Sequence, residues 1–334
     1  MSHPTPPPND GELFDRLAGV RAAVEAQLAR RIVGQKTVIE QMLVALFAGG
    51  HCLFIGVPGL AKTLLVSSLA EALGLQSGRV QFTPDLMPAD ITGTDVLEED
   101  RSTGRREMRF IPGPIFTHLL LADEVNRTPP RTQAALLQAM QEGRVTAGGR
   151  TFTLERPFAV FATQNPIEQE GTYPLPEAQL DRFMFAVDVG YPSEAEELEI
   201  VERTVVGVLP EIKAVLGRDE LLAMQGMVRR MPMDDGASRY AVRLARATRP
   251  GADAPQVTGK YVLWGAGPRA SQFLALGARV RAALAGHDTA TQEDVRAVAY
   301  AVLQHRMVLN FSADAEGIRA RDVVSRLLDQ VRER

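Results

Sequence analysis

A glycine-containing turn that ends in a lysine and a threonine is the first segment of this chain able to do chemistry. It reads Gly56-Val57-Pro58-Gly59-Leu60-Ala61-Lys62-Thr63, follows the apolar run Cys52 to Ile55 and leads at Leu64 into a helical stretch. In such a loop the backbone N–H groups and the positive end of the helix face phosphate oxygens, the lysine adds a charge and the threonine hydroxyl reaches Mg²⁺. We therefore assign residues Gly56 to Leu64 to nucleotide binding, although the general pattern has glycine in place of Ala61.

Two acids follow a second apolar run, His118 to Ala122. Asp123 and Glu124 stand directly after it, where a parallel sheet presents the carboxyl ends of its strands to a ligand. An Asp-Glu pair alone is more often part of a solvated loop, but its combination with the Lys62 loop favours phosphoryl transfer. We expect Asp123 and Thr63 to hold Mg²⁺ and Glu124 to orient and deprotonate an attacking water.

Asn165 ends a further apolar run, Phe158 to Ala162, within the segment Thr163-Gln164-Asn165-Pro166. Its amide would lie at the strand tip beside the other two loops, where it can position the water or contact the γ-phosphate of ATP. The alternative is a turn residue before a proline, which is common for asparagine.

The elements that position these residues follow from hydrophobic periodicity. Apolar residues three or four apart predict a helix from Leu13 to Leu28, and another helix ends near Ala48. Five short runs predict buried strands: Cys52–Ile55, Arg79–Phe82, His118–Ala122, Phe158–Ala162 and Met184–Val189. Helical patterns lie between most of them, so the fold class is α/β, a P-loop core with a parallel five-stranded sheet.

Beyond Tyr191 and Pro192 amphipathic helical stretches predominate. They are Glu194–Val206, Leu221–Arg230, Tyr240–Thr248, Arg269–Ala285, Glu293–Leu303 and Ala320–Val331. The predicted organisation is a disordered, proline-rich lead-in over residues 1–10, an α/β nucleotide-binding core over 11–191 and an all-helical lid domain over 192–334.

Two hairpins interrupt the core pattern. One lies between Gly93 and Pro112, with its turn around Ser102-Thr103-Gly104, and the second lies at residues 145–154, where Gly148 and Gly149 supply the positive φ angles of a tight turn. They are candidates for gripping a substrate, and the equal alternative is that they only extend the core.

Charge and composition exclude several classes. The 334 residues carry a formal charge of −4, so no general cationic field favours nucleic acid. The single cysteine cannot form an internal disulfide, which suits a reducing compartment. The chain shows neither a signal peptide nor an apolar stretch of the ~20 residues that cross a bilayer, so we expect a cytoplasmic protein without stable membrane insertion.

From about Ile32 to at least Ala270 the chain resembles the MoxR family of AAA+ ATPases. The matching segments are Gly56–Thr63, LLLADEVNR at 119–127, ATQNP at 162–166 and GTYPLPEAQLDRF at 171–183. The resemblance implies that Asn165 is the first sensor and that Arg182 is an arginine finger acting on a neighbour's nucleotide. It also implies that Arg269, after Gly267-Pro268, is the second sensor, and it places Gly34 and Gln35 on the adenine side.

The resemblance further implies a homo-oligomer, a hexameric ring, that uses ATP and Mg²⁺ to remodel a client protein. The expected role is maturation, assembly or metal loading of that client, together with a partner that carries a von Willebrand factor A domain. One alternative is a nucleic-acid motor, for which Arg101, Arg105, Arg106 and Arg109 would form a basic patch, although acidic neighbours offset them. Another is a nucleotide-gated scaffold with little turnover, against which Glu124 argues.

Overall fold

The computed structural model describes residues 9–99, 106–167, 171–205, 207 and 209–331. Most of the expected lead-in, the turn around Thr103, and the arginines Arg101 and Arg105 lie outside these ranges. Within them, no helix is both long and apolar enough to cross a membrane.

A five-stranded parallel sheet forms the centre of the core, as expected. Its order is β2-β5-β8-β1-β9. The strands are β1 (Cys52–Ile55), β2 (Ser77–Gln81), β5 (Leu119–Asp123), β8 (Ala159–Gln164) and β9 (Phe185–Asp188). Strand β1 has its predicted bounds, and the other four differ from theirs by one or two residues at an end, because hydrogen bonding continues past the apolar run in some strands and stops before it in others.

Alternate residues of the strands enter two separate hydrophobic clusters. Phe54, Leu121 and Phe161 belong to the larger cluster, whereas Leu120 and Val160, one residue away on the same strands, belong to the smaller one. Since successive side chains point to opposite faces of a sheet, both faces are covered, which explains why the strands are continuously apolar.

Helices pack around the sheet; α1 and α2 precede its first strand, and the others lie between strands in the chain. They are α1 (Asp10–Leu28), α2 (Lys36–Ala48), α3 (Lys62–Ala72), α4 (Pro88–Thr92), the 3-10 turn η1 (Val125–Arg127), α5 (Pro130–Glu142) and α6 (Glu177–Leu180). In α1 the predicted stripe is buried, and Asn9 and Glu12 form a capping box at its start. Helix α5 ends at Gly143, which is left-handed as a helix stop requires.

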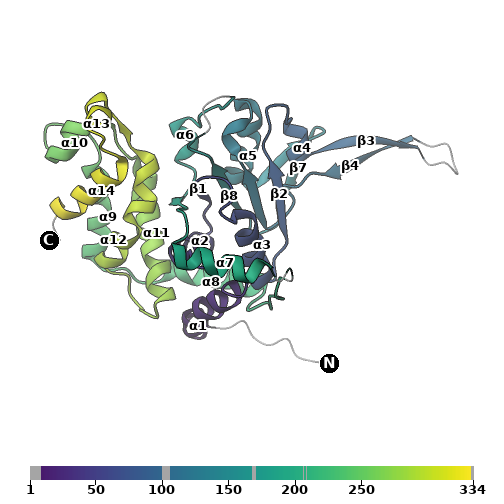
Figure 1. Ribbon diagram of the computed structural model, residues 1–334, viewed down its shortest axis with the longest axis horizontal. Helices are drawn as coiled ribbons and strands as arrows, with labels where there is room; N and C mark the ends of the chain where they lie inside the picture. The colour runs from purple at the N-terminus through teal and green to yellow at the C-terminus, as the bar shows by residue number, and fades with distance from the viewer. Residues whose placement is uncertain (1–8, 100–105, 168–170, 206, 208, 332–334) are drawn as a thin grey trace.

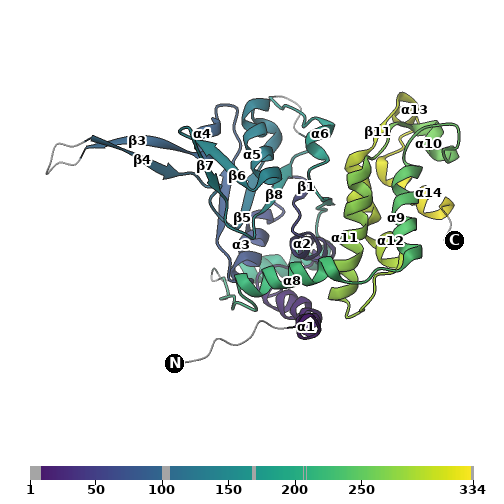
Figure 2. The same cartoon turned by 180° about the vertical axis from the view of Figure 1, so that it is seen from behind.

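The remaining residues are mainly helical; α7 (Glu194–Val205) and α8 (Arg218–Arg230) lie along the base of the core, and the later helices gather on one side of it (Figure 1). The later helices are α9 (Asp235–Ala247), α10 (Gln256–Tyr261), α11 (Pro268–Leu284), α12 (Gln292–Leu303), α13 (Phe311–Ala315) and α14 (Ala320–Gln330), with a 3-10 turn η2 (Gln304–Arg306). A short antiparallel pair, β10 (Val262–Trp264) and β11 (Val308–Leu309), joins them. These two strands have three and two residues, too few for a periodic signal, so the expectation of only helices was incomplete. Seen from behind, α8 runs along the base of the core near α1 and α2 (Figure 2), and it packs against both.

Both predicted hairpins are present. Strands β3 (Gly93–Glu99) and β4 (Arg106–Pro112) form an antiparallel ribbon that projects away from the body (Figure 1). Strands β6 (Arg144–Ala147) and β7 (Arg150–Thr153) form the second, with Gly148 at φ 56° and Gly149 at φ 73°. Phe110 of the first ribbon stacks on Phe152 of the second at 4.2 Å between ring centres, so the two hairpins support each other.

Candidate active site

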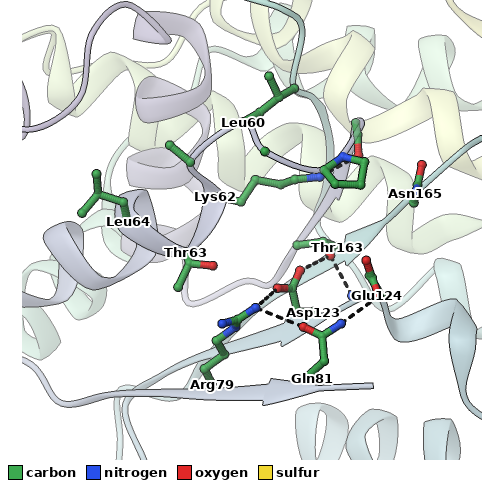
Figure 3. A pocket seen from close by; sticks show the side chains of 14 residues that line it. Leu60, Lys62, Thr63, Leu64, Arg79, Gln81, Asp123, Glu124, Thr163 and Asn165 are labelled. Carbon is green, nitrogen blue, oxygen red and sulfur yellow. Dashed lines mark hydrogen bonds and ion pairs between the residues drawn. The ribbon is translucent and has the colours of Figure 1, made fainter. Parts of the chain in front are cut away.

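One cavity at the carboxyl ends of the parallel strands collects most of the predicted site residues. Its volume is about 430 Å³, within the range of about 300–1,000 Å³ usual for small-molecule sites. Figure 3 shows the side chains around it. The lining residues are Gly56, Pro58, Gly59, Leu60, Ala61, Lys62, Thr63, Leu64, Arg79, Gln81, Asp123, Glu124, Thr163 and Asn165. Of the predicted loop, Val57 alone is not among them.

The phosphate loop has the backbone that anion binding needs. Gly59 lies at φ 85° and Ala61 at φ 54°, both left-handed, and α3 begins at Lys62. Left-handed residues in such a loop turn successive backbone N–H groups toward one concavity at the positive end of the following helix. Ala61 therefore has a backbone conformation that glycine adopts freely and that costs an L-residue roughly 1–2 kcal/mol.

Lys62 is buried beneath this loop. Its Nζ donates to the Gly56 carbonyl at 2.6 Å, which holds the ammonium group at the carboxyl end of β1. Burial lowers the pKa of Lys62, against the opposing effect of the Asp123 and Glu124 charges. A phosphate in the cavity would place negative charge beside the Lys62 ammonium and so compensate for the hydration that burial removes.

Thr163 joins the two acids. Its hydroxyl donates to Asp123 Oδ1 at 2.7 Å and accepts the backbone N–H of Glu124 at 2.8 Å. Glu124 lies at φ 57°, a strained conformation for a non-glycine residue, and such strain gathers at functional sites. The Thr163 hydroxyl thus fixes the carboxylate of one acid and the backbone of the other.

Polar side chains of β2 and η1 bind one further oxygen of each carboxylate. Arg79 lies 2.7 Å from Asp123 Oδ2, while Gln81 Nε2 and Arg127 Nη1 donate to Glu124 Oε2 at 2.7 and 2.9 Å. Arg79 and Gln81 point from β2 toward the two carboxylates (Figure 3). Sequence reasoning missed Thr163, Arg79 and Gln81. The sequence did contain a signal for Arg79 and Gln81: they are two residues apart near the carboxyl end of β2, so their side chains point to the same side of the strand.

Asn165 reaches the cavity and also serves its own turn. The residue is buried and lines the cavity, and its Oδ1 accepts the N–H of Ile167 at 3.1 Å. Both readings of Asn165, site residue and turn residue before proline, therefore have a physical basis.

Gly34 and Gln35 lie next to the phosphate loop but do not line the cavity. Both are left-handed, and Gln35 Nε2 donates to the Leu60 carbonyl at 3.2 Å. A Cβ on Gly34 would stand 2.1 Å from Glu196 Oε1, so a side chain here would displace the Glu196 carboxylate, and the left-handed backbone angle of 66° favours glycine at this position.

Comparison with known proteins identifies the family. The description "ATPase family associated with various cellular activities (AAA)" matches residues 51–185, and "AAA lid domain" matches residues 256–327. Chaperone MoxR1 of Mycobacterium tuberculosis is 43% identical over 99% of this chain and 86% of its own length. The chain belongs to the MoxR family of AAA+ ATPases. Protein MoxR of Methylorubrum extorquens is 32% identical, covering 90% of this chain and 91% of its own.

A solved structure agrees with this assignment. It is a candidate ATPase from Cytophaga hutchinsonii, with 38% identity and a TM-score of 0.89 over 96% of this chain and 97% of its own. The overall fold of the chain therefore matches that of this solved structure.

The two arginines that the MoxR resemblance singled out lie outside the cavity. Arg182 comes before β9, and Met184 donates its N–H to the His51 carbonyl at the amino end of the sheet, opposite the phosphate loop. Arg269 begins α11 as predicted, but its Nη1 lies 2.8 Å from Asp181 Oδ2. The structure brings neither residue to the nucleotide loop of its own chain.

Asp181 is the centre of an ionic cluster between core and lid, in which the Arg306 side chain is buried and those of Asp181 and Arg269 are partly exposed. Its Oδ1 accepts from Arg306 Nε at 2.9 Å, and Arg306 also donates to the Asp181 carbonyl at 3.0 Å. Burial lowers the pKa of Arg306 to about 10, and the Asp181 carboxylate counteracts this shift. Asp181 therefore pairs with Arg269 and Arg306, which sequence reasoning did not connect to it.

Proposed function

We propose that this chain binds ATP with Mg²⁺, hydrolyses the ATP, and uses the cycle to remodel a client protein. The observation that carries the proposal is the convergence of Lys62, Thr63, Asp123, Glu124 and Asn165 on one cavity from separate loops of a MoxR-family core. Phosphoryl transfer depends mainly on positioning and charge stabilisation, which is what this set of side chains can supply.

Each residue has a distinct proposed role. The loop N–H groups and Lys62 bind the phosphates, and the Thr63 hydroxyl and Asp123 carboxylate are oxygen ligands of the kind Mg²⁺ prefers. Mg²⁺, when bound, neutralises charge on the phosphate oxygens. Glu124 accepts a proton from water as the water oxygen bonds to the γ-phosphorus and the bond to the bridging oxygen breaks, which gives ADP and phosphate. Asn165 orients that water or the γ-phosphate.

A neighbouring subunit completes this site in our proposal. Arg182 lies at the end of the sheet opposite its own phosphate loop, so it can serve only another chain's nucleotide as an arginine finger. Such head-to-tail contacts close into rings, and the MoxR resemblance favours a hexamer. Arg269 is proposed as the second sensor in an arrangement of the lid other than the one described, because here it pairs with Asp181.

The partners are proposed to be proteins. Arg106 and Arg109 of the projecting hairpin are paired with Glu99 and Glu98 at 3.1 Å each, which offsets the charge that a nucleic-acid motor would use. A client, a partner carrying a von Willebrand factor A domain, a cytoplasmic location, and the division into a core over 11–191 and a lid over 192–334 complete the proposal.

Glu124→Gln tests the hydrolytic part. We expect the variant to bind ATP as the wild type does and to lose turnover, while Glu107→Gln, an equal change of charge on the exposed β4 strand, keeps it. Equal turnover by Glu124→Gln and wild type would refute Glu124 as the base. ATP binding without turnover by the wild type would instead favour the nucleotide-gated scaffold.

A further inference from the structure

Arg306, the last residue of the lid turn η2, places a buried positive charge against the core. Its side chain is 1% exposed, its guanidinium lies 5.1 Å from the centre of the Phe273 ring on α11, and it donates to the Val302 carbonyl of α12. These two contacts fix the guanidinium on the lid. A buried ion pair often adds no more stability than apolar side chains of similar volume, so stability alone does not explain a charge at this place. The contacts of Arg306 with the core therefore point to a role in positioning.

The core segment that Arg306 holds is the one that carries Arg182. Arg306 Nη2 donates to the Asp181 carbonyl at 3.0 Å and to the Phe183 carbonyl, which lie on either side of Arg182. Nη1 donates to the Met184 carbonyl at 3.2 Å, and Nε donates to the Asp181 carboxylate at 2.9 Å. A guanidinium presents five N–H donors in one plane, so a single side chain can fix several acceptors relative to one another. The backbone before and after Arg182 is therefore tied to the lid.

Other lid side chains hold β9, the strand that follows this segment. Gln304 Nε2 donates to the Ala186 carbonyl at 2.7 Å, and the Tyr300 hydroxyl donates to the Asp188 carboxylate. Helix α6, which precedes the segment, packs against η2 and lies on the side of the core nearest the lid in both views (Figures 1 and 2). The strand order places β9 at one edge of the sheet, next to β1. The lid and this edge of the core therefore form one connected unit.

The Arg182 side chain itself is left free by this arrangement. It is partly exposed, and among the described residues it has no hydrogen bond or ion pair. Because a long side chain without partners samples many rotamers, its reach toward another copy's nucleotide depends on where its backbone is held. A misplacement of about 1 Å in a reacting site can lower the rate on the order of 10²-fold. Holding the backbone on both sides of Arg182 is therefore a way in which the lid can affect hydrolysis.

We propose that Arg306 is a positioning residue for ATP hydrolysis: from the lid it holds residues 181–184 so that the Arg182 guanidinium is presented to the nucleotide of a second copy. The inference rests on the proposed function, because it takes Arg182 as the arginine finger from there and adds the residue that places it. A movement of the lid against the core either carries Arg182 with it or breaks these hydrogen bonds. The arrangement of the lid in one copy thus governs hydrolysis in the next.

Two replacements of Arg306 in the full-length chain test the proposal. Arg306→Lys keeps the charge beside Asp181 but loses the planar set of donors. Arg306→Met removes the charge, and the Asp181 carboxylate, which is 29% exposed, keeps its pair with Arg269, so the fold does not depend on tolerating a buried lysine. We expect both variants to bind a fluorescent ATP analogue as the wild type does, with kcat lowered at least about tenfold and KM little changed.

Arg296→Lys is the matched control. Arg296 donates to the Tyr240 hydroxyl at 3.0 Å and to the Leu328 carbonyl at 2.7 Å, and both partners lie within the lid. The same substitution there disturbs the lid without touching the segment that carries Arg182. We expect Arg296→Lys to keep the wild-type kcat.

Mixing experiments separate positioning of the finger from a general structural role. A copy with Arg306→Met keeps its own phosphate loop but presents its finger poorly. Mixed with Lys62→Ala, which keeps a well-placed Arg182, it should give ATPase activity severalfold above the sum of the two proteins alone. Mixed with Arg182→Ala, which also lacks a working finger, it should give no more than that sum.

The reference mixture of Arg182→Ala with Lys62→Ala distinguishes the possible failures. If the reference recovers activity, the inference is overturned when Arg306→Met recovers with Arg182→Ala but not with Lys62→Ala, because Arg306 then acts on the site of its own copy. Recovery with neither, wild-type kcat in both Arg306 variants, or failure of both variants to fold would overturn it as well. If the reference itself does not recover despite verified co-assembly, the proposed shared site fails and the inference fails with it.

Discussion

Replacement of Thr163 by valine probes how the carboxylates of Asp123 and Glu124, the two acids of the proposed site, are held. The change keeps the shape of the side chain and removes a hydroxyl that is almost wholly buried. It deletes one hydrogen bond to a charged carboxylate, worth about 1.5–3 kcal/mol, and leaves the Glu124 N–H without its acceptor, which costs about 1–3 kcal/mol. The two losses share one group and do not add fully.

We expect this cost to appear mainly in hydrolysis. Glu124 is left-handed and its N–H is held by Thr163, so without the hydroxyl its carboxylate is no longer fixed for proton transfer. A loss of about 1.4–2.7 kcal/mol in the transition state lowers kcat by roughly 10- to 100-fold. ATP affinity should change much less, because Lys62 and the loop N–H groups do not contact Thr163.

Steady-state ATPase rates and equilibrium binding of a fluorescent ATP analogue separate the two effects. Thr163→Ser, which keeps the hydroxyl, should retain most of the wild-type kcat and a similar dependence on Mg²⁺ concentration. The reasoning fails if Thr163→Val has the wild-type kcat, or if serine is as damaging as valine.

Three further outcomes concern stability and are measured by urea unfolding. Ala61→Gly should raise the free energy of unfolding by about 0.5–1 kcal/mol, since relief of left-handed strain exceeds the entropy that glycine adds to the unfolded chain; a loss would contradict the strain at this residue. Asp181→Asn should lower the free energy of unfolding by about 3 kcal/mol, because it leaves Arg306, whose side chain is 1% exposed, without a counter-charge. Arg269→Ala, which removes a partly exposed partner, should lower it by under about 1 kcal/mol. Equal losses in the two variants would contradict the larger contribution assigned to the Asp181–Arg306 pair. Burial lowers the pKa of His51 to about 4 from 6.5, so between these values the unfolded chain binds more protons than the folded chain. The free energy of unfolding should therefore fall by about 2 kcal/mol from above pH 6.5 to pH 5. The fall should be smaller in His51→Gln, which lacks the titrating group.

Patterns local in sequence were the ones that could be predicted. The five strands and the long helices follow from apolar runs and periodicity, and Gly148 and Gly149 have the positive φ angles expected for the turn of the second hairpin. The phosphate loop and Asp123 with Glu124 could be assigned because each follows its own strand directly. The ends of strands moved because a hydrogen-bonded ladder does not stop where side chains change from apolar to polar.

Contacts that depend on the order of the strands could not be predicted. Arg79 and Gln81 meet the acids only because β2 lies beside β5, and Thr163 does so because β8 lies on the other side of β5. Asp181 and Arg269 are 88 residues apart, and nothing in either segment indicates that they pair. The family resemblance implied roles for Arg182 and Arg269, but it did not indicate where the fold places either side chain.

The central claim is that ATP is hydrolysed at a site shared by two copies of the chain, and mixing two inactive variants tests it most directly. Arg182→Ala keeps its own phosphate loop and Glu124 but lacks the finger, whereas Lys62→Ala lacks the loop's lysine but keeps Arg182. Each alone should show little ATPase activity, and the mixture should recover part of it at interfaces where an intact loop faces an intact Arg182. Verified co-assembly without any recovery of turnover would contradict the account.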